Sequence, residues 1–377
     1  MSALSPQTLT GAPARFPGGL RELAPRTWAW LQPNGGLGES NAGLVVGDGE
    51  ALLIDTLWDV RLTRRMLDAM REPLAGAPLR RAFVTHPDGD HWWGNAVLPR
   101  EVEILATAAC ARAMRAEALP RVLNAMARTA ALARHAPGRV GATARFGHTQ
   151  LAPFAWRGVR LRHADRALAS AADAGRAGGA EDARATAERR SCARPEATGP
   201  ARSSARTTLE VGGREVRILD LGPTHSPADA VVHLPDVGVV FAADLLFIGV
   251  TPIMWHGPVE TWLAALDALL ALDAEVYVPG HGPPCGRAEI EQLADYWRWL
   301  RAAAADQRAA GRSVGEAARI LLRSPEHRPF ADWLNPERLL VNIATLYREP
   351  GELSPPARAR LLLQMWKMGA ELASARA

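Results

Sequence analysis

The feature that most constrains the fold of this chain is the stretch from Arg81 to Asn95, which reads RAFVTHPDGDHWWGN. Its apolar start is typical of a buried strand, and four of the six residues from His86 to His91 carry imidazole or carboxylate groups. Those groups are the ligands that hold zinc, iron or manganese in proteins. A strand that ends in such a loop can fix the ligand geometry, so the rest of the chain should supply further ligands and a pocket.

Three later positions resemble this loop, because each places a potential ligand just past the end of a predicted strand. They are the histidine of Leu221-Gly-Pro-Thr-His225, the acid of Ala242-Ala-Asp244 and the histidine of Val276-Tyr-Val-Pro-Gly-His281. A single histidine more often serves another role than metal binding. A repeated arrangement at strand ends instead indicates one common site. The sequence therefore predicts seven candidate ligands on four loops: His86, Asp88, Asp90, His91, His225, Asp244 and His281.

Hydrophobic periodicity predicts a mixed α/β core in which helices cover the sheets. Alternating or continuous apolar runs predict strands over 27–31, 42–46, 51–54, 81–85, 102–105, 207–211, 215–219, 230–234, 237–242 and 276–278. Helical spacing predicts helices over 60–71 and 260–272, and two helices over 107–135 that are broken near Pro120. From Arg287 to the end the pattern is helical, with prolines as breaks.

Composition divides the chain into four segments. Residues 1–20 are predicted to be a flexible tail rich in proline and glycine, and residues 21–286 to form the domain that holds the candidate ligands. Residues 158–206 are low in complexity and nearly lack aromatic and β-branched residues, so we expect a disordered or loosely packed insertion there. Residues 287–377 are predicted to be a helical C-terminal extension.

The net charge of +4 gives little support for nucleic-acid binding. Between Arg157 and Arg206, eleven arginines face six acids, so the basic excess comes from that one segment. We therefore expect a small-molecule substrate, and no nucleic-acid partner. The helical C-terminal region could close over the pocket as a lid or form the interface of a homo-oligomer.

A composition of 48% hydrophobic and 22% charged residues is typical of a globular protein in water. No apolar run approaches the ~20 residues that a membrane helix needs. The N-terminus lacks the basic start and apolar core of a secretory signal, so a cytoplasmic location is expected. The cysteines at 110, 192 and 285 are widely spaced, which indicates neither a disulfide framework nor a zinc ribbon.

The order and spacing of the candidate ligands resemble the metallo-β-lactamase superfamily. Its hallmark is H-x-H-x-D-H, followed by a lone histidine, an aspartate and a final histidine; this chain has His86-Pro-Asp-Gly-Asp-His91 and then the three later residues. The resemblance covers roughly residues 21–286. It implies an αββα sandwich, two β-sheets packed face to face with helices outside, to which this chain would add its helical C-terminal extension.

The resemblance also implies two metal sites. The first would use His86, Asp88 and His225. The second would use Asp90, His91 and His281, and Asp244 would bridge the two. Two divalent metal ions are therefore expected, with zinc as the leading choice and iron or manganese as alternatives.

Asp88 is the departure from the family pattern, which usually has a histidine at this position. An aspartate is shorter, harder and anionic. It could therefore shift the preference of the first site toward iron or manganese, or weaken that site.

Two neighbouring cations can lower the pKa of a shared water toward neutral and present hydroxide to an electrophile. In this arrangement Asp90 could orient the nucleophile. The expected activity is hydrolysis of a small ester, thioester, lactone or amide. Two alternatives stay open: a phosphodiesterase or nuclease on the same fold, and a metal-binding protein without hydrolytic activity.

Other residues near the motifs have weaker claims. Trp92, Trp255 and His256 are candidates for substrate contact, although aromatic residues beside a site more often serve packing. Tyr347 and Arg348 could reach the site from the C-terminal helices. Asp55, at a strand end, is a candidate for holding a ligand histidine, and Asp229 has less to recommend it.

Overall fold

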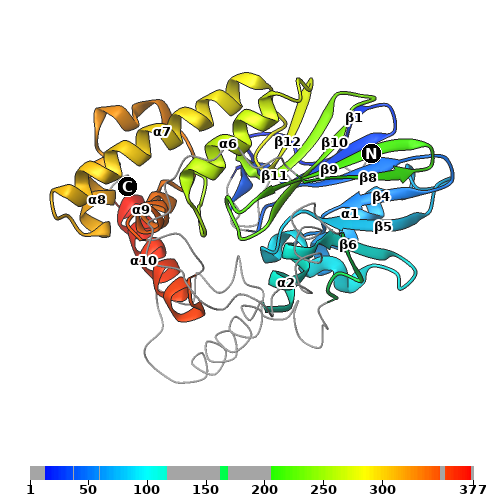
Figure 1. Ribbon diagram of the computed structural model, residues 1–377, viewed down its shortest axis with the longest axis horizontal. Helices are drawn as coiled ribbons and strands as arrows, with labels where there is room; N and C mark the ends of the chain where they lie inside the picture. Colours follow the sequence, from blue (N-terminus) through cyan, green and yellow to red (C-terminus); the bar gives the residue numbers. More distant parts are fainter. Residues whose placement is uncertain are drawn as a thin grey trace, which may run out of the picture.

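The computed structural model describes residues 13–36, 38–58, 60–116, 162–168, 205–348 and 353–374. Most of the predicted insertion and the predicted helical segment after residue 116 lie outside these ranges, as do residues 1–12. Within the described ranges the chain forms two sheets with helices on their outer faces (Figure 1).

The first sheet has seven strands in chain order and contains the N-terminal part of the fold. Strands β1 to β4 are antiparallel neighbours, whereas β4, β5, β6 and β7 run parallel. The bounds are β1 Gly19–Ala24, β2 Thr27–Leu31, β3 Ala42–Val46, β4 Ala51–Ile54, β5 Leu79–Val84, β6 Glu103–Thr107 and β7 Arg166–Leu168. Helix α1, Val60–Ala69, makes the crossover between the parallel strands β4 and β5.

The second sheet has five strands in the order β12-β11-β10-β9-β8. Their bounds are β8 Ala205–Val211, β9 Arg214–Gly222, β10 Asp229–Leu234, β11 Val239–Phe247 and β12 Val276–His281. Pairing is antiparallel except between β11 and β12, which are joined through helix α6, Val259–Leu270. The predicted strands of both halves are confirmed, with ends that differ by a few residues.

The inner faces of the two sheets pack directly on each other and form the central core. Buried side chains from both sheets meet there, including Ile54 and Phe83 from the first and Val232 and Phe241 from the second. A Cβ at Gly43 on β3 would lie 2.4 Å from the Phe241 ring. Glycine at this position therefore lets an aromatic side chain of the second sheet pack against the backbone of the first.

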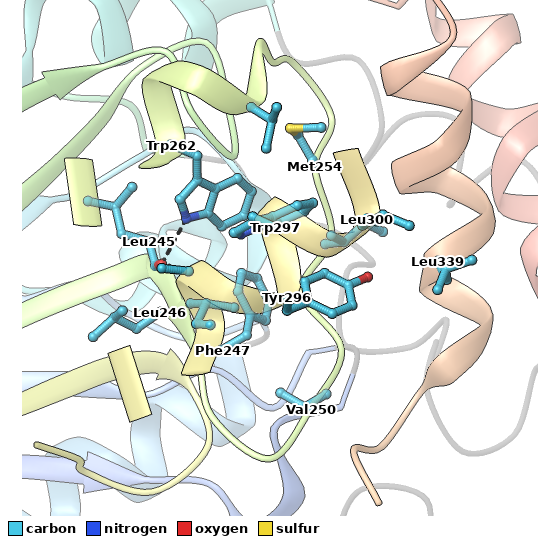
Figure 2. Close-up of a cluster of buried hydrophobic side chains, with 14 of the residues drawn as sticks. Leu245, Leu246, Phe247, Val250, Met254, Trp262, Tyr296, Trp297, Leu300 and Leu339 are labelled. Carbon is cyan, nitrogen blue, oxygen red and sulfur yellow. Dashed lines mark hydrogen bonds between the residues drawn. The ribbon is translucent and has the colours of Figure 1, made fainter. Parts of the chain in front are cut away.

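Helices cover both outer faces, which completes the predicted αββα sandwich. Helices α1 and α2, Ala108–Ala116, pack on the seven-stranded sheet through residues such as Met66 and Met114. On the other face, Trp262 of α6 and Trp297 of the next helix pack over β11 with ring centroids 4.6 Å apart. Figure 2 shows the Trp262 indole directed at the backbone of Leu245, to which it donates a hydrogen bond of 3.0 Å.

The C-terminal extension is helical, as its pattern predicts. It contains α7 Arg287–Ala309, α8 Val314–Leu321, α9 Leu339–Leu346 and α10 Pro355–Ser374, which gather beside α6 at one end of the molecule (Figure 1). Apolar side chains of all four helices belong to the same buried cluster as the outer face of β11. No helix in the described ranges combines the length and apolarity needed to cross a membrane.

Two predicted segments, the tail and the insertion, extend too far. The tail prediction extended too far, because Arg15 is tied by its backbone amide to Asn34 Oδ1 at 2.6 Å and β1 begins at Gly19. The insertion prediction also extended too far at both ends. Residues 166–168 form the edge strand β7 beside β6, and β8 begins at Ala205. Backbone pairing with an existing strand orders these short segments although their side chains bury little surface.

Candidate metal centre

The opening motif lies where β5 leaves the seven-stranded sheet. After Val84 the chain passes through Thr85 and His86 and then forms a 3₁₀ turn over Gly89–His91. A Cβ at Gly89 would lie 2.1 Å from the Trp93 ring, so this turn can close on the indole only with glycine there. The turn places the ligand candidates of the motif on one side and both tryptophans in the core.

All seven predicted ligands come together at one edge of the sandwich. Loops of both sheets contribute, since the first four candidates follow β5 and the other three belong to the second sheet. His86, Asp88 and His225 offer ligand atoms that lie within 4.8 Å of one another, and so do Asp90, His91 and His281. These are the two groups that the family resemblance implies.

Asp244 lies between the two groups. Its carboxylate is 3.6 Å from Nε2 of His86, 3.1 Å from Nε2 of His91, 3.3 Å from Nε2 of His225 and 3.4 Å from Nε2 of His281. Burial opposes its ionisation, yet the four histidines hold the pKa of this carboxyl well below its usual range. A carboxylate that faces four imidazoles is placed to bridge two cations.

The position of Asp244 in the strand differs from the prediction. We expected it just past a strand end, but β11 continues to Phe247. Ala243 has a φ of 46°, and the pairing register with β12 shifts on both sides of it. This irregularity is a bulge, and bulges are a common way to redirect a side chain next to an active site. The strand can therefore continue while Asp244 reaches the edge.

The donor set fits divalent metal ions. Imidazole nitrogens and carboxylate oxygens are suited to zinc, iron or manganese. Within the described residues, Nε2 of His86, Nε2 of His91 and Oδ1 of Asp244 are buried and form no well-oriented hydrogen bond, although the last two atoms lie 3.1 Å apart. Buried polar atoms are seldom left without a partner, so their convergence indicates a ligand that binds at this point.

Asp55 fixes the orientation of the motif histidines. Its carboxylate accepts hydrogen bonds from the Thr85 backbone amide at 2.8 Å and from the Thr85 hydroxyl at 2.7 Å, and lies 2.9 Å from Nδ1 of His91. The same hydroxyl lies 3.0 Å from Nδ1 of His86. Because both Nδ1 atoms are engaged, both rings turn Nε2 toward Asp244, the arrangement usual for metal-binding histidines.

His225 is held by the loops on either side of it. Its Nδ1 donates to the carbonyl of Ile253 at 2.6 Å, so Nε2 faces Asp88 and Asp244. Burial disfavours the charged ring, but the neighbouring carboxylates raise the pKa of His225 to about 9. A metal ion that binds at Nε2 would have to displace a proton from this ring.

Asp229 has a larger role than its sequence context indicated. Its buried carboxylate accepts hydrogen bonds from the backbone amides and hydroxyls of Thr224 and Ser226, which flank His225. These bonds fold the turn that presents the histidine. The signal in the sequence was the Thr224-His-Ser-Pro-Ala-Asp229 pattern, in which an acid follows two hydroxyl residues at turn spacing.

We expect Asp229→Asn to lower the free energy of unfolding by about 2–3 kcal/mol, because the amide nitrogen cannot accept the bonds that one carboxylate oxygen accepts. Urea denaturation would measure this change. Asp332→Asn is the matched control, since that acid is exposed on the C-terminal extension. Equal midpoints for both variants would contradict the assigned role.

Asn41 is a supporting residue that the sequence reasoning did not single out. Its side-chain amide donates to the carbonyls of Pro279 at 2.9 Å and Gly282 at 2.8 Å, on either side of His281. Its backbone amide donates to Gly280 at 2.8 Å. One residue before β3 therefore fixes the histidine loop of the opposite sheet.

Gly280 makes the close approach of β12 and β11 possible. A Cβ at this position would lie 1.9 Å from Oδ1 of Asp244. We expect Gly280→Ala to displace that carboxylate and to weaken metal binding at least tenfold, as chelator competition would measure. Gly76→Ala, where a Cβ would meet no atom within 4 Å and the backbone is not in the left-handed region, tests a glycine change away from the site. Unchanged metal affinity in Gly280→Ala would contradict a central position for Asp244.

Asp88 has a partner that the sequence reasoning missed. Nη2 of Arg358, on α10, lies 3.1 Å from each oxygen of the Asp88 carboxylate, and Oδ2 of Asp88 is 3.1 Å from Nε2 of His225. Burial alone would raise the pKa of Asp88, but Arg358 and His225 hold it well below its usual range. Asp88 is therefore a carboxylate in the site and not a protonated acid.

Two of the three candidates for substrate contact, Trp92 and Trp255, are buried. Trp92 is 0% exposed and donates from its indole nitrogen to the Pro87 carbonyl at 2.7 Å, so its predicted substrate contact is wrong. Trp93 is buried in the same core. Trp255 is largely buried beneath Arg358, with the guanidinium 4.4 Å from its ring centroid.

His256 lines a cavity of about 280 Å³ between α6, α7 and α9, and Tyr347 and Arg348 line the same cavity. Its lining includes none of the seven ligand candidates. Arg348 donates to the carbonyls of Trp255 and His256, so it supports the loop after β11. Substrate contact by His256 stays a prediction.

Comparison with known proteins supports this description of the fold. The family model described as the metallo-beta-lactamase superfamily matches residues 35–106 and 165–281, which include all seven ligand candidates. The α subunit of 2,4-dinitroanisole O-demethylase from Nocardioides sp. (strain JS1661) is 28% identical over 123 residues, 31% of this chain and 36% of that protein. A linear primary-alkylsulfatase from Pseudomonas sp. (strain ATCC 19151) is 34% identical over 100 residues, 24% of this chain and 18% of that protein.

A solved structure extends the comparison of the fold. The inverting sec-alkylsulfatase of Pseudomonas sp. matches with a TM-score of 0.57 at 17% identity, over 88% of this chain and 50% of that chain. This chain therefore spans only part of the length of the relatives that it matches. The structural likeness includes the helices beyond the sandwich, because the match covers more of the chain than the family model does.

Proposed function

Because this chain belongs to the metallo-β-lactamase superfamily, we propose that it is a metal-dependent hydrolase of a small ester-type substrate. The proposal rests on one observation above the others. Four histidine Nε2 atoms and three carboxylates converge at the sheet edge in two groups of three, with Asp244 between them.

Divalent metal ions bound there would supply Lewis acidity and would lower the pKa of a water molecule toward neutral. Neighbouring residues of the chain orient the rings of the candidate ligands. Asp55 and the Ile253 carbonyl orient the rings of His91 and His225. Asp244 would bridge the two groups. Zinc is the proposed ion, and iron or manganese are the alternatives that the oxygen ligand Asp88 favours.

Asp90 is proposed as the catalytic residue that contacts the attacking water. Its Oδ2 lies 3.5 Å from Nε2 of His281, which places one oxygen among the ligands. The other oxygen could accept a hydrogen bond from the water and keep a lone pair of that water directed at the substrate. The Ser40 hydroxyl donates to the Asp90 backbone carbonyl at 2.6 Å and so fixes the turn that carries this acid.

The proposed substrate class rests on the matched relatives as well as on the metal chemistry. One matched relative is named for cleaving linear primary alkyl sulfates, and another for the O-demethylation of an aromatic ether. Both reactions act at an oxygen substituent of a small organic molecule. Sulfate esters therefore join the carboxylic esters, thioesters, lactones and amides that the metal chemistry accommodates.

A substrate panel with purified protein tests the proposal. It would contain a primary alkyl sulfate, a carboxylic ester, a thioester, a lactone, an amide, 2,4-dinitroanisole and a phosphodiester. We expect metal-dependent hydrolysis of at least one ester-type compound, lost on chelation and restored by zinc, manganese or iron. Activity on the phosphodiester alone would favour a phosphodiesterase. A metal-loaded protein that hydrolyses none of them would contradict the proposal.

A further inference from the structure

The contact between Asp88 and Arg358 joins the proposed metal centre to the C-terminal helix. Nη2 of Arg358 lies 3.1 Å from both carboxylate oxygens, and the two side chains are 13% and 26% exposed. Shielding from water makes such a pair stronger than the exposed ion pairs of the surface. The residues are 270 positions apart in the chain, so the tertiary fold alone brings them together.

A second contact, with the Trp255 ring, also restricts Arg358. Its guanidinium lies over the Trp255 ring, 4.4 Å from the centroid, and this stacking restricts the long side chain. The backbone amide of Trp255 in turn donates to the His225 carbonyl at 3.0 Å. Arg358 therefore contacts one ligand of the first site directly and reaches the loop that supports another.

The helix that carries Arg358 is anchored independently of the site. Met365 and Met368 of α10 are buried in the helical core. Farther along, Glu371 forms a two-pronged ion pair with Arg319 of α8, with a shortest distance of 2.8 Å. Because these contacts hold the C-terminal half of α10, Arg358 extends from a helix whose position does not depend on Asp88.

Charge explains why Asp88 needs such a partner. A neutral histidine at this position would add no charge to the first site, whereas Asp88 adds one negative charge beside Asp244. The positive charge of the Arg358 guanidinium compensates the negative charge that Asp88 adds. The guanidinium also engages both carboxylate oxygens, which fixes the orientation of the ligand in the manner of outer hydrogen-bond partners in known metal sites.

We propose that Arg358 is a positioning residue of the metal centre and that Asp88 and Arg358 act together as the replacement for a histidine. The C-terminal helix is then a functional part of the first metal site. This inference rests on the proposed metal-binding function. The inference and the proposed function make different predictions, because the inference concerns the coupling between Asp88 and Arg358 and not the presence of metal.

A double-mutant cycle measures this coupling. Cobalt(II) would be titrated into metal-free wild type, Asp88→His, Arg358→Met and the double variant, with its visible spectrum as the readout. Methionine keeps an unbranched, flexible side chain that can pack on Trp255 without the charge. Loss of an outer hydrogen-bond partner typically costs 10–100-fold in metal affinity, so we expect at least a tenfold loss for Arg358→Met.

Asp88→His should lose at least tenfold as well, because the guanidinium would face imidazoles and a dication without its carboxylate. Adding Arg358→Met to that variant should then recover affinity by about tenfold instead of reducing it further. Arg360→Met, which removes an exposed arginine from the same helix, should leave cobalt affinity unchanged. Hydrogen exchange of α10 in each metal-free variant would verify that the helix remains folded.

The outcomes separate this inference from the proposed function. If the two substitutions lower affinity independently, so that their effects multiply in the double variant, the pairing is refuted and metal binding is not. If wild type binds no cobalt, both the inference and the proposed function fail. Recovery in the double variant, with the Arg360→Met control unchanged, supports the inference.

Discussion

Replacement of Asp244 by alanine is expected to abolish binding of two metal ions and to lower kcat/KM about a thousandfold on any substrate that the protein hydrolyses. Its carboxylate lies within 3.6 Å of four histidine Nε2 atoms. Without it the proposed bridging ligand is lost, and the four buried imidazoles lose the carboxylate that they share. A loss of about 4 kcal/mol in transition-state stabilisation corresponds to roughly this factor.

Metal analysis and steady-state kinetics on the same preparations would measure both effects. Asp244→Asn keeps the shape and removes the charge, so a similar loss in that variant would attribute the effect to charge and not to a cavity. Asp236→Ala, in the exposed turn that precedes β11, is the matched control and should behave as wild type. Two metal ions per chain in Asp244→Ala would contradict the bridging role.

Replacement of Trp262 by alanine is expected to lower the free energy of unfolding by about 3–5 kcal/mol, the usual cost of removing a large buried aromatic side chain. This indole is fully buried, donates to the Leu245 carbonyl and packs against Trp297 (Figure 2). It also meets the His225 ring edge-on at 5.9 Å between centroids. The substitution should therefore loosen the ligand as well as the core.

Urea denaturation would give the change in stability, and chelator competition the change in metal affinity. Leu363→Ala on α10 is the control, because that side chain is 50% exposed and its loss should cost no more than about 0.5 kcal/mol. A loss below about 1 kcal/mol in Trp262→Ala would show that the helical layer does not stabilise the sheet under the site. Trp262→Phe should lie between the two.

The strands and the ligand loops were predictable because their signals are local. Apolar runs such as Ala51–Ile54 and turn pairs such as Gly212-Gly213 determine strands through side-chain period and turn geometry. The order of the seven candidates was readable for the same reason. Nothing in that pattern required knowledge of which loops meet in space.

The errors have a common physical origin in tertiary contacts. The direction of Trp92 depends on the core cluster that it joins beside the first sheet, and the bulge at Ala243 depends on pairing between β11 and β12. Short segments such as Arg166–Leu168 become strands only because β6 offers an edge. Local composition carries no information about these partners.

Arg358 was the largest omission, and it could have been anticipated only in part. An aspartate at a position where the family has histidine brings an extra negative charge, which calls for a cation nearby. The sequence contains many arginines after residue 287, and none of them lies in a distinctive motif. Only the packing of α10 selects the one that reaches Asp88.

The most direct test of the account is the metal content of purified wild-type protein, determined by mass spectrometry together with protein concentration from amino-acid analysis. We expect two divalent metal ions per chain after reconstitution. This number should fall to zero after chelation and return to two when metal is restored. A chain that remains folded but retains no metal under every reconstitution condition would contradict it.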